Sequence, residues 1–351
     1  MNINELLSLM VEKQASDLHL KVGSSPSFRI NGEYTSSGFP VLTADEARDL
    51  MGQMTTVEQK QQFDDELELD FAYAIPDIAR FRVNVFLQNG ALASVIRLIP
   101  LQILTIEDLN LPPILKTLSE KPKGLVLITG PTGCGKSTTI AAMVDHINST
   151  SHCHIITIED PVEFLHKEKL AIIDQREVGR DTLSFQSALK RVLRQNPDVI
   201  VIGEVRDLET MTTAITAAET GHLVFATLHT NSAAETIDRV VDMFPSIQQQ
   251  QIRSQLSLAL EAVICQVLVP RANGKGRVVA LEIMLANSAI RNQIRVNDLA
   301  QISSTIMTSK DEGMQTLELA FKNLISQNII TLEEAMSHTR NIEALKRLVA
   351  R

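Results

Sequence analysis

Short apolar runs separated by segments with helical spacing fill the middle of the chain. The runs lie at residues 125–129, 154–158, 199–202 and 223–228. Apolar strands that alternate with helices form a mainly parallel sheet covered by helices on both faces. The pattern therefore predicts an α/β fold for this part of the chain. Beyond Met284 the apolar spacing predicts several further helices.

The N-terminal part of the chain shows shorter and more varied patterns. Residues 3–13 have helical spacing, and Asn31-Gly32 is typical of a tight turn in a hairpin. Thr43 and Glu46 have the spacing of a capping box, which begins another helix. Together these patterns predict a small α+β domain. Its expected strands lie at residues 16–22, 28–30, 33–35, 67–75, 80–88 and 91–98.

The composition changes near Pro100, and a chain of 351 residues is long for a single core. We therefore expect two domains joined by a linker. The N-terminal α+β domain would cover residues 1–99, and an extended linker would cover residues 100–113. The α/β domain would cover residues 114–351.

Composition narrows the classes of function. No apolar run has the length of a transmembrane helix, and the N-terminus has no signal-peptide pattern, so we expect a cytosolic protein. Cys134, Cys153 and Cys265 lie far apart, which fits neither a disulfide framework nor a zinc site. The formal net charge is −9, so any basic surface would have to be local, and no nucleic-acid partner is expected.

A glycine-rich segment between the first of these strands and the next helix has the spacing of a phosphate-binding loop. Glycines in such a loop let backbone N–H groups converge on phosphate oxygens at the positive end of a helix. Lys136 would contact the β- and γ-phosphates, and the Ser137 hydroxyl would ligate Mg²⁺. We therefore expect the chain to bind ATP with Mg²⁺. The candidate binding residues are Gly130, Thr132, Gly133, Cys134, Gly135, Lys136, Ser137 and Thr138.

Cys134 lies inside this loop, among converging N–H dipoles at a helix N-terminus. Such surroundings favour the thiolate, so we expect alkylation of Cys134 to inactivate the protein and bound nucleotide to protect it. The alternative is a buried and inert thiol.

Carboxylates follow two of the predicted strands, where a parallel sheet places its ligand sites. Glu159, Asp160 and Glu163 follow the second strand. Hydrolysis of a γ-phosphate needs a positioned water, and we expect Glu163 to orient and deprotonate it while the other two shape the site. Glu204 follows the third strand and would support Mg²⁺ and catalysis. Away from a phosphate loop, such carboxylates would be typical of a solvated strand end.

A histidine stands at each end of the strand 223–228. His229 follows its carboxyl end, where a γ-phosphate would lie, so this side chain could report the state of the nucleotide. His222 precedes the strand and is a second candidate for nucleotide binding. Either histidine could instead be structural, and His222 could close the preceding helix.

Arg82 and Arg97 are expected to oppose each other on one face of the N-terminal sheet. If Asn89-Gly90 forms a two-residue turn, the register of the hairpin pairs these two arginines and places Arg80 on the same face. Opposed arginines repel, so an anion should lie between them. It could be a carboxylate of the domain, or a phosphate of the neighbouring subunit's nucleotide, on which Arg82 and Arg97 would act in catalysis.

As a set, these motifs resemble those of the secretion ATPases of type II secretion and type IV pili. In that family the phosphate loop and residues 158–163, 203–207 and 220–230 correspond to the Walker A, Asp-box, Walker B and His-box motifs. Residues 16–20 resemble the family's N-terminal signature, and residues 313–317 its C-terminal one.

The resemblance implies a hexameric ring whose subunits have a PAS-like N-terminal domain and a RecA-like C-terminal domain. It also implies Mg²⁺-ATP sites between subunits and docking on a platform protein at the cytoplasmic face of the inner membrane. The likeness is greatest to the branch that retracts type IV pili, so we expect a motor ATPase that removes pilin subunits.

Four alternatives stay open. The chain could be an accessory retraction ATPase that works with a second, main one. It could be an extension or secretion ATPase, although these usually carry a further N-terminal domain and a four-cysteine zinc insertion. A nucleic-acid translocase could use the same core, but would need basic or aromatic surfaces. A non-catalytic nucleotide switch would not need Glu163 and Glu204.

The sequence departs from the family pattern in two places. Cys134 stands where the family usually has a small hydroxyl residue or glycine. In the helix 289–296, Gln293 replaces a leucine of the retraction ATPases and Val296 replaces a glutamate. We expect this helix to pack with Ile290 and Ile294 and to expose a polar face with Arg291, Asn292 and Arg295, through which nucleotide state reaches the pilus machinery. An ordinary solvated helix would show the same pattern.

Overall fold

The computed structural model describes residues 1–30, 32–76, 78–99, 103–339 and 341–350. The chain forms two compact units. Unit 1 comprises Met1–Gln102 and Glu163–Leu165, and unit 2 comprises Ile103–Val162 and His166–Arg351. Among the described residues, no helix is both long enough and apolar enough to cross a membrane.

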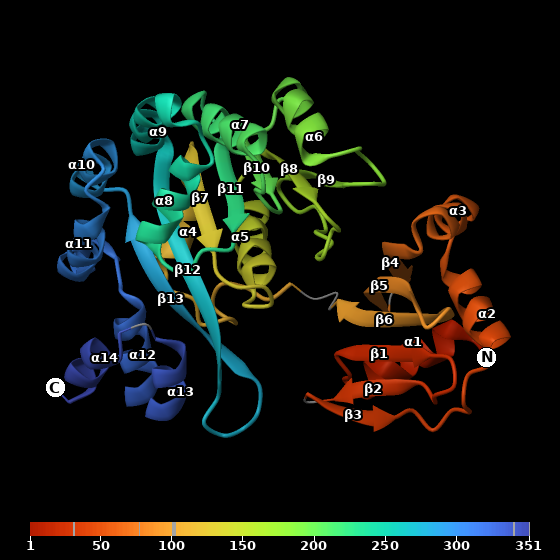
Figure 1. Ribbon diagram of the computed structural model, residues 1–351. Helices are drawn as coiled ribbons and strands as arrows, with labels where there is room; N and C mark the ends of the chain where they lie inside the picture. Colours follow the sequence, from red (N-terminus) through yellow and green to blue (C-terminus); the bar gives the residue numbers. More distant parts are fainter. Residues whose placement is uncertain (31, 77, 100–102, 340, 351) are drawn as a thin grey trace. The chain divides into compact units, whose positions relative to one another are not determined.

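Unit 1 is built on a six-stranded antiparallel sheet with the order β3-β2-β1-β6-β5-β4 (Figure 1). Its strands are β1 Asp17–Lys21, β2 Ser27–Ile30, β3 Glu33–Ser36, β4 Glu68–Ile75, β5 Ala79–Gln88 and β6 Ala91–Ile99. Its helices are α1 Ile3–Glu12, α2 Ala44–Met54 and α3 Val57–Glu66. The strands expected from the sequence are confirmed, although Asn31 of the expected turn lies outside the described residues.

Local sequence explains how the helices of unit 1 begin and pack. The capping box of Thr43 and Glu46 is present at the start of α2. Helix α3 has no counterpart in the sequence analysis, because its composition is almost entirely polar and only Phe63 is buried. The largest core side chains of the unit include Phe28 and Phe81, both fully buried.

Unit 2 contains a seven-stranded sheet with the order β13-β12-β7-β11-β10-β8-β9. All neighbouring strands are parallel except β12 and β13, which form an antiparallel pair. The mainly parallel sheet expected from the alternating pattern is therefore confirmed. The strands are β7 Gly124–Thr129, β8 His154–Glu159, β9 Ile172–Glu177, β10 Val199–Ile202, β11 Leu223–Leu228, β12 Leu260–Pro270 and β13 Arg277–Leu285.

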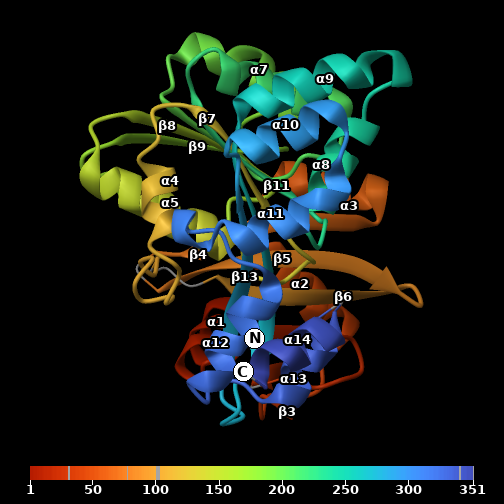
Figure 2. The same cartoon turned by 90° about the vertical axis from the view of Figure 1, so that its left-hand side faces the viewer.

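Helices cover both faces of this sheet, because successive strand residues point to opposite sides. One face, with Leu125 and Leu127 of β7, packs on α6, α7, α8 and α9, and on α10 and α11 from the C-terminal region. The other face, with Val126 and Ile128, packs on α4 and α5. Helix α9 contacts both α7 and α10 (Figures 1 and 2). These helices are α4 Ile114–Ser119, α5 Lys136–Thr150, α6 Phe185–Val192, α7 Leu208–Glu219, α8 Ala233–Asp242 and α9 Ser246–Ala259.

The helices expected beyond Met284 are confirmed. Helices α12, α13 and α14 gather around the far end of the β12–β13 hairpin, where Phe321 and Leu345 are fully buried (Figure 1). The C-terminal helices are α10 Ser288–Val296, α11 Ile302–Thr308, α12 Leu317–Ser326, α13 Leu332–His338 and α14 Ile342–Val349. Short 3₁₀ turns lie at Leu193–Gln195, Leu299–Gln301 and Lys310–Glu312.

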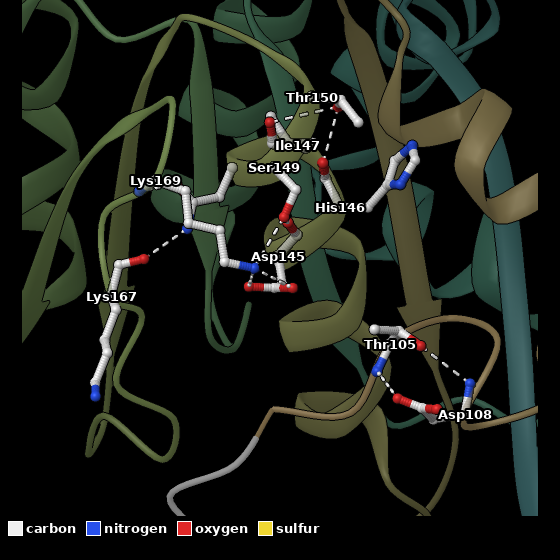
Figure 3. Close-up of polar contacts among 10 residues, drawn as sticks. Thr105, Asp108, Asp145, His146, Ile147, Ser149, Thr150, Lys167 and Lys169 are labelled. Carbon is white, nitrogen blue, oxygen red and sulfur yellow. Dashed lines mark hydrogen bonds and ion pairs between the residues drawn. The ribbon is translucent and has the colours of Figure 1, made fainter.

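Residues 103–113, expected in an extended linker, form part of unit 2 in the structure. Ile106 and Leu111 are buried in its core. Thr105 and Asp108 exchange hydrogen bonds of 3.0 and 3.1 Å between the backbone N–H of one and the side chain of the other (Figure 3). The apolar residues of this segment therefore serve packing.

Candidate nucleotide-binding site

The glycine-rich loop joins the end of β7 to the start of α5. Gly130, Gly133 and Gly135 have φ values of 138°, 76° and 91°, a region of backbone space that side chains rarely adopt. A Cβ at Gly130 would also stand 2.3 Å from the backbone oxygen of Gln266. The loop therefore requires glycine both for its turn and for its close approach to β12.

The candidate binding residues of the loop differ in exposure. Thr132 is exposed, whereas Ser137 and Thr138 are half-buried in the first turn of α5. The Lys136 ammonium donates to the carbonyl oxygens of Gly130 at 2.7 Å and of Pro131 at 3.2 Å. The lysine thus curls back over its own loop.

Charged side chains from three strand ends meet at this edge of the sheet. Strand β11 lies between β7 and β10, and all three run parallel, so their carboxyl ends share one edge. His229 follows β11, and its Nδ1 lies 3.5 Å from the Lys136 ammonium while its Nε2 lies 3.0 Å from the Glu204 carboxylate. Arg206 holds the other oxygen of Glu204 at 2.7 Å. The result is a continuous chain of Lys136, His229, Glu204 and Arg206.

The charge state of Glu204 follows from these neighbours. The hydrogen bond from Arg206 is the main cause that holds the pKa of the Glu204 carboxyl below its usual value, and His229 adds to it against the effect of burial. In turn, the hydrogen bond and the charge of Glu204 raise the pKa of Arg206, and the charge of Asp160 adds a smaller effect. Glu204 is thus a carboxylate acceptor at neutral pH.

The carboxylates that follow β8 have separate surroundings. An oxygen of Glu159 accepts hydrogen bonds from the Thr157 hydroxyl at 2.7 Å and the Gln175 amide at 3.3 Å. Glu163 lies beyond the strand in the segment Glu163–Leu165, which groups with unit 1. The contacts that join Lys136, His229 and Glu204 do not include Glu163.

The chain on either side of Glu163 is fixed to unit 2. The backbone N–H of Val162 donates to the buried Glu177 carboxylate at 3.1 Å. On the other side, the side chain of Asn148 accepts from the Lys169 N–H at 2.9 Å and donates to the Lys167 carbonyl at 2.8 Å. The Lys169 ammonium also reaches both oxygens of Asp145 on α5 (Figure 3). Helix α5 thus carries Lys136 at its start and anchors this segment near its end.

His222 lies at the opposite edge of the sheet from the phosphate loop of its own chain. It precedes β11, whose first residue, Leu223, pairs with Gly124 at the start of β7. Its Nδ1 lies 2.9 Å from the carbonyl oxygen of Ala217 near the end of α7. The contacts within one chain therefore do not support the nucleotide role expected for His222. They fit the alternative, in which His222 closes the preceding helix, α7.

The prediction that Cys134 is a thiolate is wrong. Cys134 is 3% exposed, and burial raises the pKa of its thiol above the usual value. The charge of Lys136 and nearby N–H donors lower it by less. The structure supports the alternative of a buried thiol.

The register expected for the arginines of unit 1 is confirmed, since Arg82 pairs with Arg97 across β5 and β6. Each has a carboxylate beside it: the Arg97 Nε lies 3.0 Å from Asp17, and the Arg82 Nε lies 3.6 Å from Asp70. Both guanidinium groups remain substantially exposed. Each arginine is therefore paired with its own carboxylate from the strand on its outer side, β1 or β4, and the two do not share one anion from this set.

Helix α10 differs in part from its expected role. Ile290 and Ile294 are fully buried, as the spacing predicts. Arg291, expected on an exposed face, instead donates to the carbonyl oxygens of Ser257 and Leu258 and to Glu261. Arg291 thus ties α10 to the end of α9 and the start of β12.

Three residues of this region were absent from the sequence analysis: Asn148, Glu177 and Gln266. Asn148 and Gln266 are almost completely inaccessible, and each is a polar residue within an otherwise apolar pattern. A polar residue in an apolar pattern is the one feature of the sequence that could have indicated Asn148 and Gln266. Their hydrogen-bond partners could not be predicted, because they lie 19 to 132 residues away along the chain.

Known proteins share this architecture over nearly the whole chain. The crystal structure of the pilus retraction motor PilT with bound ADP has a TM-score of 0.92 and 45% identity, and the match covers 99% of both chains. Together with the parallel sheet and its glycine-rich loop, this likeness confirms the expected fold class, a RecA-like secretion ATPase core with a smaller α+β domain.

The family model for Type II/IV secretion system proteins matches residues 1–337, and the chain belongs to this family. The type IV pilus retraction ATPase PilT of Pseudomonas aeruginosa is 49% identical over 335 residues, which are 95% of this chain and 97% of that protein. The type IV pilus ATPase PilU of the same organism is 41% identical over 349 residues, which are 99% of this chain and 91% of that protein.

Proposed function

We propose that this chain is a motor ATPase that retracts type IV pili and thereby powers twitching motility. The observation that carries the proposal is the likeness to PilT along almost the full length of both proteins. The loop between β7 and α5, and the charged residues at the neighbouring strand ends, supply the groups that ATP hydrolysis requires.

The roles of the site residues follow from their positions. Lys136 now contacts two loop carbonyls, and a nucleotide would offer its phosphates in their place. Glu163 would orient and deprotonate the attacking water. His229 lies beside Lys136 and Glu204 lies beside His229, so this pair would sense the γ-phosphate through the contact of His229 with the lysine.

The residues at this edge fit a Mg²⁺ ion. Mg²⁺ takes few protein ligands, prefers oxygen donors and keeps several waters. The Ser137 hydroxyl in the first turn of α5 would be its direct ligand. Both oxygens of Glu204 already have a partner, Arg206 on one and His229 on the other, so we assign Glu204 to the waters around the ion. The metal would neutralise charge on the phosphates.

The proposed assembly is a homohexamer with nucleotide sites between subunits. Arg82 and Arg97 would then act on the neighbouring subunit's nucleotide. Their exposure permits this, and each would exchange its contact with Asp70 or Asp17 for a phosphate. The ring would dock on a platform protein at the cytoplasmic face of the inner membrane.

A second candidate is an accessory retraction ATPase that works beside a main one. The considerable identity to PilU favours keeping this possibility. Deletion of the gene separates the two. We expect loss of the main motor to leave cells with excess pili that cannot retract, whereas loss of an accessory motor would leave retraction partly intact. A strain without any pili would contradict retraction and support extension.

Purified protein tests the chemistry separately. Lys136→Ala should abolish nucleotide binding, because the phosphates lose their cation. Glu163→Gln should keep binding and stop turnover, because only the activation of water is lost. A Glu163→Gln protein that hydrolyses ATP at the rate of the unmodified protein would move the base elsewhere, with Glu204 the first residue to test.

A further inference from the structure

Gln266 contacts the phosphate loop from the neighbouring strand. It follows Cys265, which pairs with Thr129, the last residue of β7. Gln266 is 1% exposed, so its side chain lies inside the unit. Its backbone carbonyl oxygen lies only 2.3 Å from the position that a Cβ of Gly130 would take. The first residue of the loop is therefore packed directly on Gln266.

The side chain of Gln266 reaches the other end of the same loop. Its Nε2 donates a hydrogen bond of 2.7 Å to the carbonyl oxygen of Cys134, and both groups are buried. A Cβ at Gly135, the residue before Lys136, would lie 3.3 Å from this nitrogen. A single residue of β12 thus contacts both ends of the turn that precedes Lys136.

This contact sets the direction of one carbonyl group. A phosphate loop binds anions because its N–H groups point to the phosphates, and a carbonyl oxygen turned the same way would repel them. The amide of Gln266 draws the Cys134 carbonyl towards β12. It also constrains the peptide that leads into Gly135 and Lys136.

Stability alone does not explain a glutamine at this position. Its Oε1 is buried, and it has no hydrogen-bond partner among the residues that the structure describes. Burying an amide oxygen in this way is unfavourable, and an apolar side chain of similar size would avoid it. The donor atom Nε2 is what distinguishes glutamine from such a side chain.

We propose that Gln266 is a positioning residue for nucleotide phosphates, acting through its hydrogen bond to the Cys134 carbonyl. The inference rests on the proposed ATP-dependent function. It assigns no contact between Gln266 and the nucleotide. It predicts instead that loss of the donor weakens phosphate binding while the fold stays intact.

The first test replaces Gln266 with methionine, which has similar length and no donor. We expect the affinity of the full-length protein for a fluorescent ADP analogue to fall about tenfold or more, with an unchanged or higher melting temperature. Gln315→Met is the matched control. The Gln315 amide also donates to a backbone carbonyl, that of Leu281 in β13, which is not part of the loop. This control should keep the affinity and lower the melting temperature. A folded Gln266→Met protein with unchanged affinity would overturn the proposal.

Gln266→Glu keeps the test informative if the methionine variant does not fold. A protonated glutamic acid can donate to the Cys134 carbonyl, and a carboxylate cannot. We expect nucleotide affinity to rise as pH falls from about 8 to about 6, beyond any change in the unmodified protein, because burial favours the protonated form. At the lower pH this variant should bind more tightly than Gln266→Met. Equal affinities there would show charge repulsion only and overturn the positioning role.

The two proposals fail differently. If the unmodified protein binds no nucleotide, the proposed function fails. If the unmodified protein binds nucleotide, Lys136→Ala does not, and both Gln266 variants bind like the unmodified protein, only the inference on Gln266 fails.

Discussion

The double change Gln293→Leu and Val296→Glu restores in α10 the residues that the retraction ATPases carry, and its effect on stability can be worked from the structure. The Gln293 amide donates to the Thr305 hydroxyl at 2.8 Å, while its Oε1 is buried without a partner among the described residues. Removing that unsatisfied oxygen raises the free energy of unfolding by roughly 1–3 kcal/mol, and losing the hydrogen bond lowers it by roughly 0.5–1.5 kcal/mol. The leucine change is therefore stabilising by about 1 kcal/mol.

The second change opposes this gain. Val296 is 60% exposed in the last turn of α10, so a glutamate there has room, but its charge lies at the negative end of the helix. That arrangement costs about 0.3–1 kcal/mol. The sum lies within about 1 kcal/mol of zero, which for a unit of this size is a shift in melting temperature of about 2–4 °C or less.

Because stability barely changes, any effect on motility would come from altered coupling between ATP turnover and the pilus machinery. Ala289–Val296 lies outside the nucleotide site, so we expect ATP turnover to stay within about twofold. Twitching motility should increase, since the helix then matches that of the retraction ATPases. Turnover is measured with purified protein, and motility by the spread of complemented cells. A collapse of turnover would make α10 part of the catalytic ring, and unchanged motility would show that the two departures are neutral.

Three further predictions concern the site and the assembly. Cys134 should react with iodoacetamide at least about tenfold more slowly in the native than in the denatured chain, because it is buried, and equal rates would refute this. Asn148→Ala should lower kcat about tenfold while changing nucleotide affinity little, because it frees the segment after Glu163. Lys167→Ala, which keeps the bonded backbone carbonyl, is its control, and equal kcat in the two variants would contradict the effect. Arg97→Ala and Lys136→Ala should each lower ATPase activity, and mixing the two kinds of subunit should restore part of it, because some shared sites would then have both residues. No recovery in rings shown to exchange subunits would count against shared sites.

The site residues that the sequence could locate are those at strand ends. A parallel sheet brings the carboxyl ends of its strands to one edge, so Lys136, Glu204 and His229 could be expected together from their order in the chain. The same rule separates the two histidines. His222 precedes β11 and therefore belongs at the amino ends of the strands, away from Lys136.

Two of the elements that were not predicted from the sequence share a physical cause. Strand β9 has the sequence IIDQRE and helix α3 has VEQKQQFDDE, and neither shows the apolar period of its class. Strands β12 and β13 were also not predicted, although both are mainly apolar. Arg291 shows the limit for single side chains. Helical spacing places it beside the apolar stripe of α10, but the carbonyl groups that bind it belong to α9, which the spacing does not reveal.

The contacts of His229 also indicate which of its ring nitrogens donates, which no sequence pattern could reveal. The Lys136 ammonium has only donors, so the His229 Nδ1 that faces it must be the acceptor. The proton of the neutral ring then sits on Nε2, where it donates to Glu204. In this way the position of one ammonium group decides which ring nitrogen of His229 donates to Glu204.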